Sequence, residues 1–120
     1  MSNEISDKFA TIESFKQLMR DFVAERNWEK YHTPKNLAAA ASVEAAELLE
    51  LFQWLTPEEA IDKPINEPLF RQAVSEELAD VLMYLISLAN VLNLDVTQTV
   101  NQKMSKNCLK YPPGKVSRSL

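Results

Sequence analysis

Four carboxylates are spaced three residues apart in two apolar stretches of the chain. Glu44 and Glu47 interrupt a run rich in Ala and Leu, and Glu77 and Asp80 interrupt a second apolar run. With about 100° of rotation per residue, each pair emerges on one side of a helix, one turn apart and within an apolar arc. Burying several carboxylates together opposes their ionisation unless cations are present. The spacing therefore predicts a divalent metal site for Mg²⁺, or Mn²⁺ as a substitute, since both take oxygen ligands.

Alternatives to this metal site depend on where the protein's own cations lie. No Lys, Arg or His occurs between Asn36 and Leu55 or between Gln72 and Gln102, so an ion-pair network would need Lys or Arg from the first and last helices. A di-iron bundle needs Glu-x-x-His on two helices, and the only histidine, His32, lies outside both acidic stretches. The non-enzymatic alternative is a helical interaction module whose acids bind a structural cation.

Helical periodicity and capping signals place these acids in an all-α fold. Thr33-Pro34 and Asp95 are typical helix starts, and Thr56 with Glu59 fits a capping box. We expect that box to open one short turn within a segment that is otherwise loop. The prediction is a four-helix bundle, with helices over residues 11–27, 34–55, 68–92 and 95–110.

Composition limits the class of protein. The 120 residues suit one domain, residues 1–111, followed by a flexible polar tail, residues 112–120. A net charge of −4 argues against nucleic acid as a partner. No apolar run is long enough for a membrane span, and the first residues lack a signal-peptide pattern. With Cys108 as the one cysteine, a cytoplasmic location is expected.

Several motifs in order carry a resemblance to a known family. The chain contains E-A-A-E-L-L-E-L-F-Q-W, then E-E-L-A-D-V-L-M-Y-L, then K-M-S-K-N-C-L-K-Y-P. Together with H-T-P-K-N-L upstream, this order resembles the MazG-like nucleoside triphosphate pyrophosphohydrolases, most closely their dCTP pyrophosphatase branch, over residues 11–112. The resemblance implies Mg²⁺ on Glu44, Glu47, Glu77 and Asp80. It also implies hydrolysis between the α and β phosphates, giving monophosphate and pyrophosphate, with a role in cleaning the nucleotide pool.

The resemblance also implies roles for further residues. Glu47 or Glu50 would act as the general base, and the sequence does not choose between them. The last helix would contact the triphosphate, and aromatic side chains would line a base pocket; these residues are Lys103, Asn107, Lys110 and Tyr111, and Trp28, His32, Trp54 and Tyr84. The lysines could instead complement a helix dipole, and the aromatics could be core or interface.

At two positions the chain departs from the pattern of the family that it resembles. Met19 stands where some relatives have histidine, and Asn27 where aspartate is usual, so base selectivity is less constrained than the reaction. A dUTPase-like diphosphohydrolase is therefore a second enzymatic alternative.

The helix over 34–55 is apolar nearly all round, and family members assemble as dimers or tetramers, so we expect a homo-oligomer, a dimer of dimers.

Overall fold

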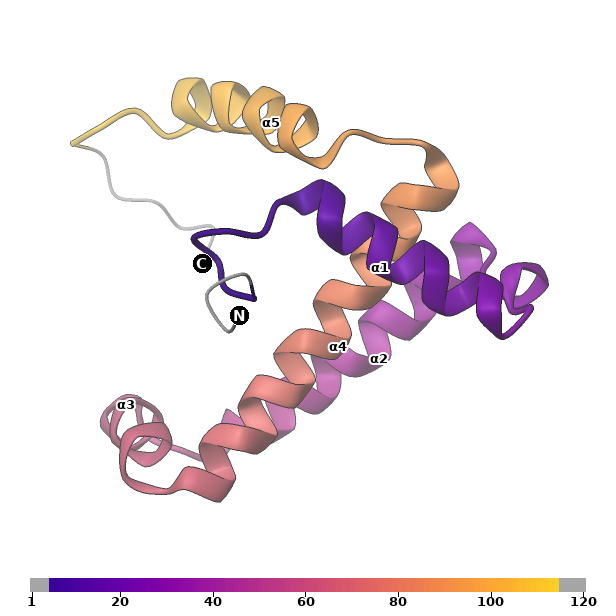
Figure 1. The fold of residues 1–120 in the computed structure, drawn as a ribbon. Helices are drawn as coiled ribbons and strands as arrows, with labels where there is room; N and C mark the ends of the chain where they lie inside the picture. Colours follow the sequence, from indigo (N-terminus) through magenta and orange to yellow (C-terminus); the bar gives the residue numbers. More distant parts are fainter. Residues whose placement is uncertain (1–4, 115–120) are drawn as a thin grey trace.

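A computed structural model describes residues 5–114, and within this range the chain is helical and contains no strand, which confirms the all-α class (Figure 1). A short 3₁₀ turn, η2 (Glu29–Tyr31), follows the first helix. The α-helices are α1 (Ile12–Glu25), α2 (Pro34–Phe52), α3 (Pro57–Asn66), α4 (Pro68–Leu92) and α5 (Val96–Lys110). The part of the expected tail after residue 114 lies outside the described residues.

Local capping starts the helices where the sequence predicts. Thr33 accepts a hydrogen bond from the backbone N–H of Asn36, with Pro34 in the first turn. Asp95 accepts from the N–H of Gln98 at 2.9 Å. These side chains satisfy N–H groups that have no partner inside the helix. The predicted helix starts at 34 and next to 95 are confirmed.

The segment expected to be mostly loop forms a helix instead. Thr56 and Glu59 make the predicted capping box, but α3 continues to Asn66 with Pro64 inside it. Proline removes one backbone donor, yet the N–H of Glu67 still bonds the carbonyl of Lys63 at 2.9 Å. Packing of α3 on the start of α4 supports the helix, so the loop prediction for this segment was wrong.

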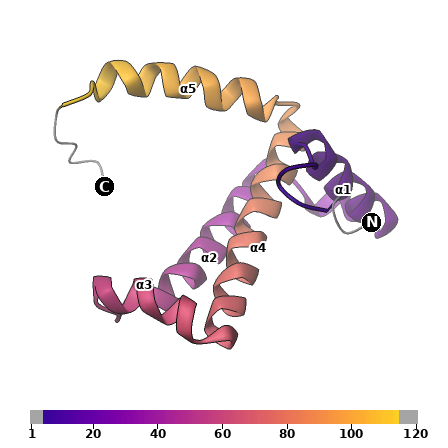
Figure 2. The ribbon, with the colours of Figure 1, turned by 60° about the vertical axis from the view of Figure 1, so that its left-hand side comes forward.

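Helices α2 and α4 pack side by side in opposite directions, and this pair is the centre of the molecule (Figures 1 and 2). Leu37 is 2% exposed, and Ala41 and Ala89 are also buried. Alanines let two helix backbones approach closely, so polar groups on the facing sides come within reach of one another. This pairing brings the two acidic stretches together.

Helix α1 crosses the C-terminal end of α4 and is fixed there by polar contacts. The Nζ of Lys16 donates to the carbonyl of Leu94 at 2.7 Å. Asn90 donates from Nδ2 to the carbonyl of Lys16 at 3.0 Å, and its Oδ1 accepts from Arg20 at 2.9 Å. These bonds set the position of α1 beside the middle and end of α4.

Helix α5 leaves this core. Asn93 has a left-handed backbone (φ 54°) at the end of α4, a conformation that asparagine tolerates, and α5 then runs away from the α2–α4 pair (Figure 2). The chain is consequently more open than a closed bundle. No single helix among the described residues meets the length and apolarity of a membrane span; α4 and α5 do so only as a pair bent by 101°.

Candidate active site

Three carboxylates meet where α2 and α4 pack. Glu44 comes from α2, and Glu77 and Asp80 come from α4 at a spacing of one turn. Each of the three offers an oxygen within 4.8 Å of the others, and all three side chains are half-buried. The i, i+3 spacing puts Glu77 and Asp80 on the face of α4 that Glu44 approaches. Residues 33 positions apart in sequence therefore form one oxygen-rich site.

The proximity of these acids perturbs their ionisation. The Glu77 carboxyl beside Glu44 raises the pKa of Glu44 above its ordinary value of 4.5, although contact with Glu47 opposes this. Glu44 in turn raises the pKa of Glu47, with a further contribution from the charge of Glu50. Like charges held together favour the protonated form. The carboxylates of the cluster therefore repel one another wherever they are ionised, and a bound cation would relieve this repulsion.

The donor set fits a hard divalent ion. The Oε2 atoms of Glu44 and Glu77 are buried and have no hydrogen-bond partner. Buried polar atoms are normally paired, and carboxylate oxygens are the ligands that Mg²⁺ and Mn²⁺ prefer. Between residues 5 and 114, the ion pairs join Arg20 to Glu13 and Arg26 to Glu25, so the alternative network of Lys or Arg with the clustered acids does not form.

A cavity of about 400 Å³ opens beside the acid cluster, between α1, the η2 turn and α4. Asp80 belongs both to the cluster and to the wall of this cavity. Apolar and aromatic side chains make up most of the wall, which is lined by Leu18, Met19, Phe22, Trp28, His32, Asp80, Met83 and Tyr84. We call this space the aromatic cavity. Its flat walls suit a planar ring.

Aromatic contacts hold one wall of the aromatic cavity. The rings of Trp28 and His32 are stacked, with centroids 6.4 Å apart. Phe22 meets Trp28 edge to face at 5.6 Å, and the guanidinium of Arg26 lies 3.8 Å from the Phe22 ring centroid. Asn27 has φ 55° and turns the chain between the end of α1 and Trp28. Asparagine adopts this left-handed backbone more readily than most residues.

The predicted site residues fall into two groups. Glu47 joins the acid cluster through its contact with Glu44, and the cavity gathers three of the predicted aromatic and imidazole side chains, which are Trp28, His32 and Tyr84. Other predicted residues lie apart. Glu50 is exposed, and Trp54 is 87% exposed and does not line the aromatic cavity. The residues predicted to bind the triphosphate lie on or just after α5, away from the acids (Figure 1): Lys103, Asn107, Lys110 and Tyr111.

Sequence reasoning did not assign some of the cavity wall. Leu18 and Phe22, within the predicted first helix, and Met83 also line the cavity, and none of the three was singled out as a site residue. The sequence feature that could have found these residues is the amphipathic spacing of the helices. This spacing shows which side chains face inward, but it does not show whether they meet another helix or a cavity. Met83 precedes Tyr84, and its place in the wall depends on how α1 crosses α4.

Comparisons with known proteins agree with this architecture. A model of the MazG-like family matches residues 39–118. dCTP pyrophosphatase 1 from Bos taurus is 43% identical over 102 residues, which cover 85% of this chain and 60% of that protein. The Homo sapiens protein of the same name is also 43% identical, with 85% and 59% covered. The matched region thus spans about 60% of the length of these curated relatives.

A solved structure also resembles this chain, and the match covers nearly the whole length of that structure. The crystal structure of a pyrophosphatase from Archaeoglobus fulgidus DSM 4304 has a TM-score of 0.77 and 43% identity, covering 84% of this chain and 92% of that one. Fold and site together define an all-helical protein with a cluster of carboxylates that could hold a metal ion. The chain belongs to the MazG-like family, as the sequence motifs predicted.

Proposed function

We propose that this protein is a metal-dependent nucleoside triphosphate pyrophosphohydrolase that prefers dCTP and converts it to dCMP and pyrophosphate. The observation that carries the proposal is the double place of Asp80, which is in the acid cluster and in the wall of the aromatic cavity. A base in the cavity would put its triphosphate beside the carboxylates. The similarity to proteins named dCTP pyrophosphatase 1 supports the choice of base.

The residues divide the work of this reaction. Glu44, Glu47, Glu77 and Asp80 would hold the metal ion, which when bound supplies charge neutralisation for the phosphates and activation of water. Water would attack the α-phosphorus in line with the departing pyrophosphate. Trp28, His32 and Tyr84 would orient the base by stacking and edge contacts.

In this proposal, the general base is Glu50, which is exposed on α2. Glu47 is half-buried and contacts Glu44, whereas Glu50 lies one turn further along α2 and is exposed. A base must reach the attacking water while it remains free to accept a proton. Neither residue is in the clustered trio, but the contact of Glu47 with Glu44 favours Glu47 for metal binding, and the exposed position of Glu50 favours it for proton transfer.

Product analysis tests this function directly. The purified protein is incubated with Mg²⁺ and each common dNTP and NTP, together with dUTP and dUDP, and products are separated by chromatography. Formation of dCMP and pyrophosphate, lost on adding EDTA, supports the proposal. Preference for dUTP or dUDP would favour a dUTPase-like diphosphohydrolase, and metal-dependent stability without turnover would favour a non-catalytic module. A nucleotide-cleaning role in the cytoplasm is part of the same proposal.

The open shape of the chain supports a homo-oligomer. The accessible surface is 9797 Å², whereas a compact monomer of this mass exposes about 6,600 Å². The radius of gyration is 17.1 Å, against about 13.6 Å for a compact chain of this length. Leu49 and Leu82, on α2 and α4, remain 60% and 52% exposed. An excess of roughly 3,000 Å² is enough for more than one standard interface, as a dimer of dimers requires.

In an oligomer, α5 and Trp54 could contribute to the active site of a neighbouring copy. Lys103, Lys106 and Lys110 lie on a helix that runs away from the acids of its own chain (Figure 2). Symmetric assembly can place such a helix against a neighbouring copy. In our proposal, the lysines and Asn107 contact the triphosphate held by the acids of a neighbouring copy, with Tyr111 and Trp54 closing the same composite site.

A further inference from the structure

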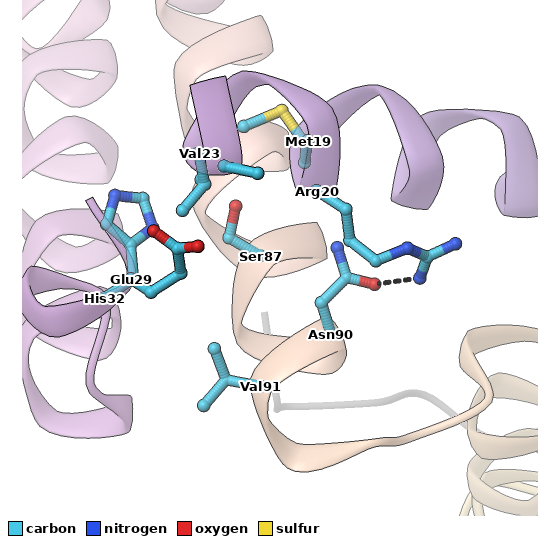
Figure 3. A pocket seen from close by; sticks show the side chains of 9 residues that line it. Met19, Arg20, Val23, Glu29, His32, Ser87, Asn90 and Val91 are labelled. Atoms are coloured by element: carbon cyan, nitrogen blue, oxygen red, sulfur yellow. Dashed lines mark hydrogen bonds between the residues drawn. The ribbon is translucent and has the colours of Figure 1, made fainter. Parts of the chain in front are cut away.

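Asn90 is a polar side chain near the end of α4, within the largely apolar run of residues 85–92. Asparagine is a poorer helix former than the leucines and alanine around it, because its amide competes for backbone hydrogen bonds. Asn90 is half-buried and lies where α1 crosses α4 (Figure 3). An amide at such a place is expected to have hydrogen-bond partners.

Both ends of the Asn90 amide bond to α1. Its Nδ2 donates to the carbonyl of Lys16 at 3.0 Å, and its Oδ1 accepts from Nη1 of Arg20 at 2.9 Å, the bond drawn in Figure 3. Lys16 and Arg20 are four residues apart, so they lie on one face of α1. Asn90 therefore spans one turn of α1 and holds both its backbone and a side chain. We call these two bonds the Asn90 clamp.

Helix α1 has few other anchors. Among its residues, all of which the structure describes, Val23 is the one that is buried. Leu18 and Phe22 remain 62% and 39% exposed, and α4 is the helix on which α1 mainly packs. The bond from Nζ of Lys16 to the carbonyl just beyond α4, at 2.7 Å, is the further polar anchor. With so little apolar burial, the Asn90 clamp is a large part of what positions α1.

The position of α1 determines the shape of the aromatic cavity. Facing side chains of the two helices form most of the wall, which consists of Leu18, Met19 and Phe22 from α1 and Asp80, Met83 and Tyr84 from α4. Neither Asn90 nor Arg20 lines this cavity. The clamp can therefore act on the cavity only through the spacing of α1 from α4.

We propose that Asn90 is a positioning residue for nucleotide binding, which holds α1 at the distance from α4 at which the aromatic cavity accepts a base. The inference rests on the proposed function. Without the clamp, a smaller fraction of molecules has the cavity in this form, and the apparent affinity falls by that fraction. The acids Glu44 and Glu77 lie on the α2–α4 pair, so the chemical step is retained.

Steady-state kinetics with dCTP separates positioning from a general loss of structure. Asn90→Ala should raise KM about five- to tenfold, as expected for two lost hydrogen bonds, and change kcat by no more than about twofold. Arg20→Ala removes one of the two bonds and should raise KM less. The double variant should have the KM of Asn90→Ala within about twofold, because both changes remove the same bond. Glu13→Ala is the matched control, since it breaks the ion pair of Arg20 within α1 and leaves the clamp in place.

Amide hydrogen exchange measures the clamp without any turnover. In Asn90→Ala, the amides of α1 should exchange about five- to tenfold faster, whereas those of α2 should keep their rates. If the wild type does not hydrolyse dCTP, the proposed function fails, and this exchange still decides whether Asn90 holds α1. If Asn90→Ala does not fold, Arg20→Ala, at an exposed side chain, carries both measurements.

Three results would overturn the proposal. The first is exchange in α1 that stays at the wild-type rate in Asn90→Ala. The second is an active Asn90→Ala enzyme whose KM is unchanged, or whose kcat falls as much as its KM rises. The third is a double variant in which the two effects on KM multiply, since independent effects would mean that Asn90 and Arg20 do not act through their shared bond.

Discussion

The carboxylates of Glu44 and Glu77 face each other across the α2–α4 interface, and each has a buried Oε2 without a hydrogen-bond partner. Two such oxygens from different helices are a strong constraint on function. They are costly as a purely structural feature. They are favourable when a cation binds between them.

Glu77→Gln should abolish turnover, with a loss of more than about a hundredfold in kcat. The amide keeps the size of the side chain but removes one negative charge from the metal site. The measurement is pyrophosphate release from dCTP, with helical circular dichroism and oligomer size as checks of the fold. Glu76→Gln is the matched control, since Glu76 is exposed and bonded only to Gln72 among the described residues. Full activity in Glu77→Gln would remove this residue from the metal site.

Metal binding should stabilise the protein more at pH 7.5 than at pH 5. The pKa values of Glu44 and Glu47 are raised in the folded chain. Their contribution to stability is fully present below the unfolded value near 4.5, and it is lost as pH rises through the raised values. Mg²⁺ counters the resulting repulsion where the acids are ionised.

The measurement for this pH dependence is Tm by circular dichroism, with Mg²⁺ and with EDTA at each pH. Taking the difference between the two conditions cancels titration elsewhere in the chain. Glu44→Gln is the comparison, because it removes one of the repelling charges and should lessen the dependence. An equal Mg²⁺ effect on Tm at both pH values would contradict the assignment of the ion to these carboxylates.

Trp28→Ala should raise KM for dCTP by about 5- to 150-fold, from the loss of one stacking contact worth about 1–3 kcal/mol. Trp28 stacks with His32 and is supported by Phe22 in the wall of the aromatic cavity. Steady-state kinetics checks this, and Tyr31→Ala is a control at an exposed aromatic three residues away. If KM rises equally in both variants, Trp28 has no special role with the base.

Much of this fold follows from local sequence signals. Thr33, Thr56 and Asp95 cap helices with their own side chains, so the helix starts depend on few neighbours. The length of α3 was not predictable in the same way. Pro64 indicates a break, but contacts outside the segment keep it helical, including Lys63, whose Nζ lies 4.7 Å from the ring centroid of Phe70 on α4.

The candidate site, like the fold, was predictable from the sequence only in part. Rotation about the helix axes identified the acids, because α2 and α4 pack with their apolar faces together and the acids interrupt these faces. The same reasoning could not place Lys103 or Trp54. The direction that α5 takes after Asn93 sets the distance of Lys103 from the acids, and Trp54 lies just beyond the end of α2. Neither placement is encoded in helical periodicity.

Lys103→Ala should raise KM for dCTP about five- to tenfold, since a charge-assisted contact to phosphate is lost, and should change kcat less. Lys35→Ala, at an exposed lysine near the start of α2, is the matched control. The measurement is steady-state kinetics at fixed Mg²⁺ and ionic strength. If KM is unchanged, Lys103 instead complements the α5 dipole.

Mixed oligomers should show which copy Lys103 serves. Glu77→Gln chains and Lys103→Ala chains are unfolded together and refolded as a mixture, then assayed at a dCTP concentration below the KM of Lys103→Ala. If Lys103 serves a neighbouring copy in paired sites, about one quarter of all sites combine an intact Glu77 with an intact Lys103 after random pairing, and activity exceeds the mean of the separately refolded variants. If Lys103 serves its own chain, no site regains both residues and activity equals that mean. That second result would contradict the composite site and leave the acid cluster assignment intact.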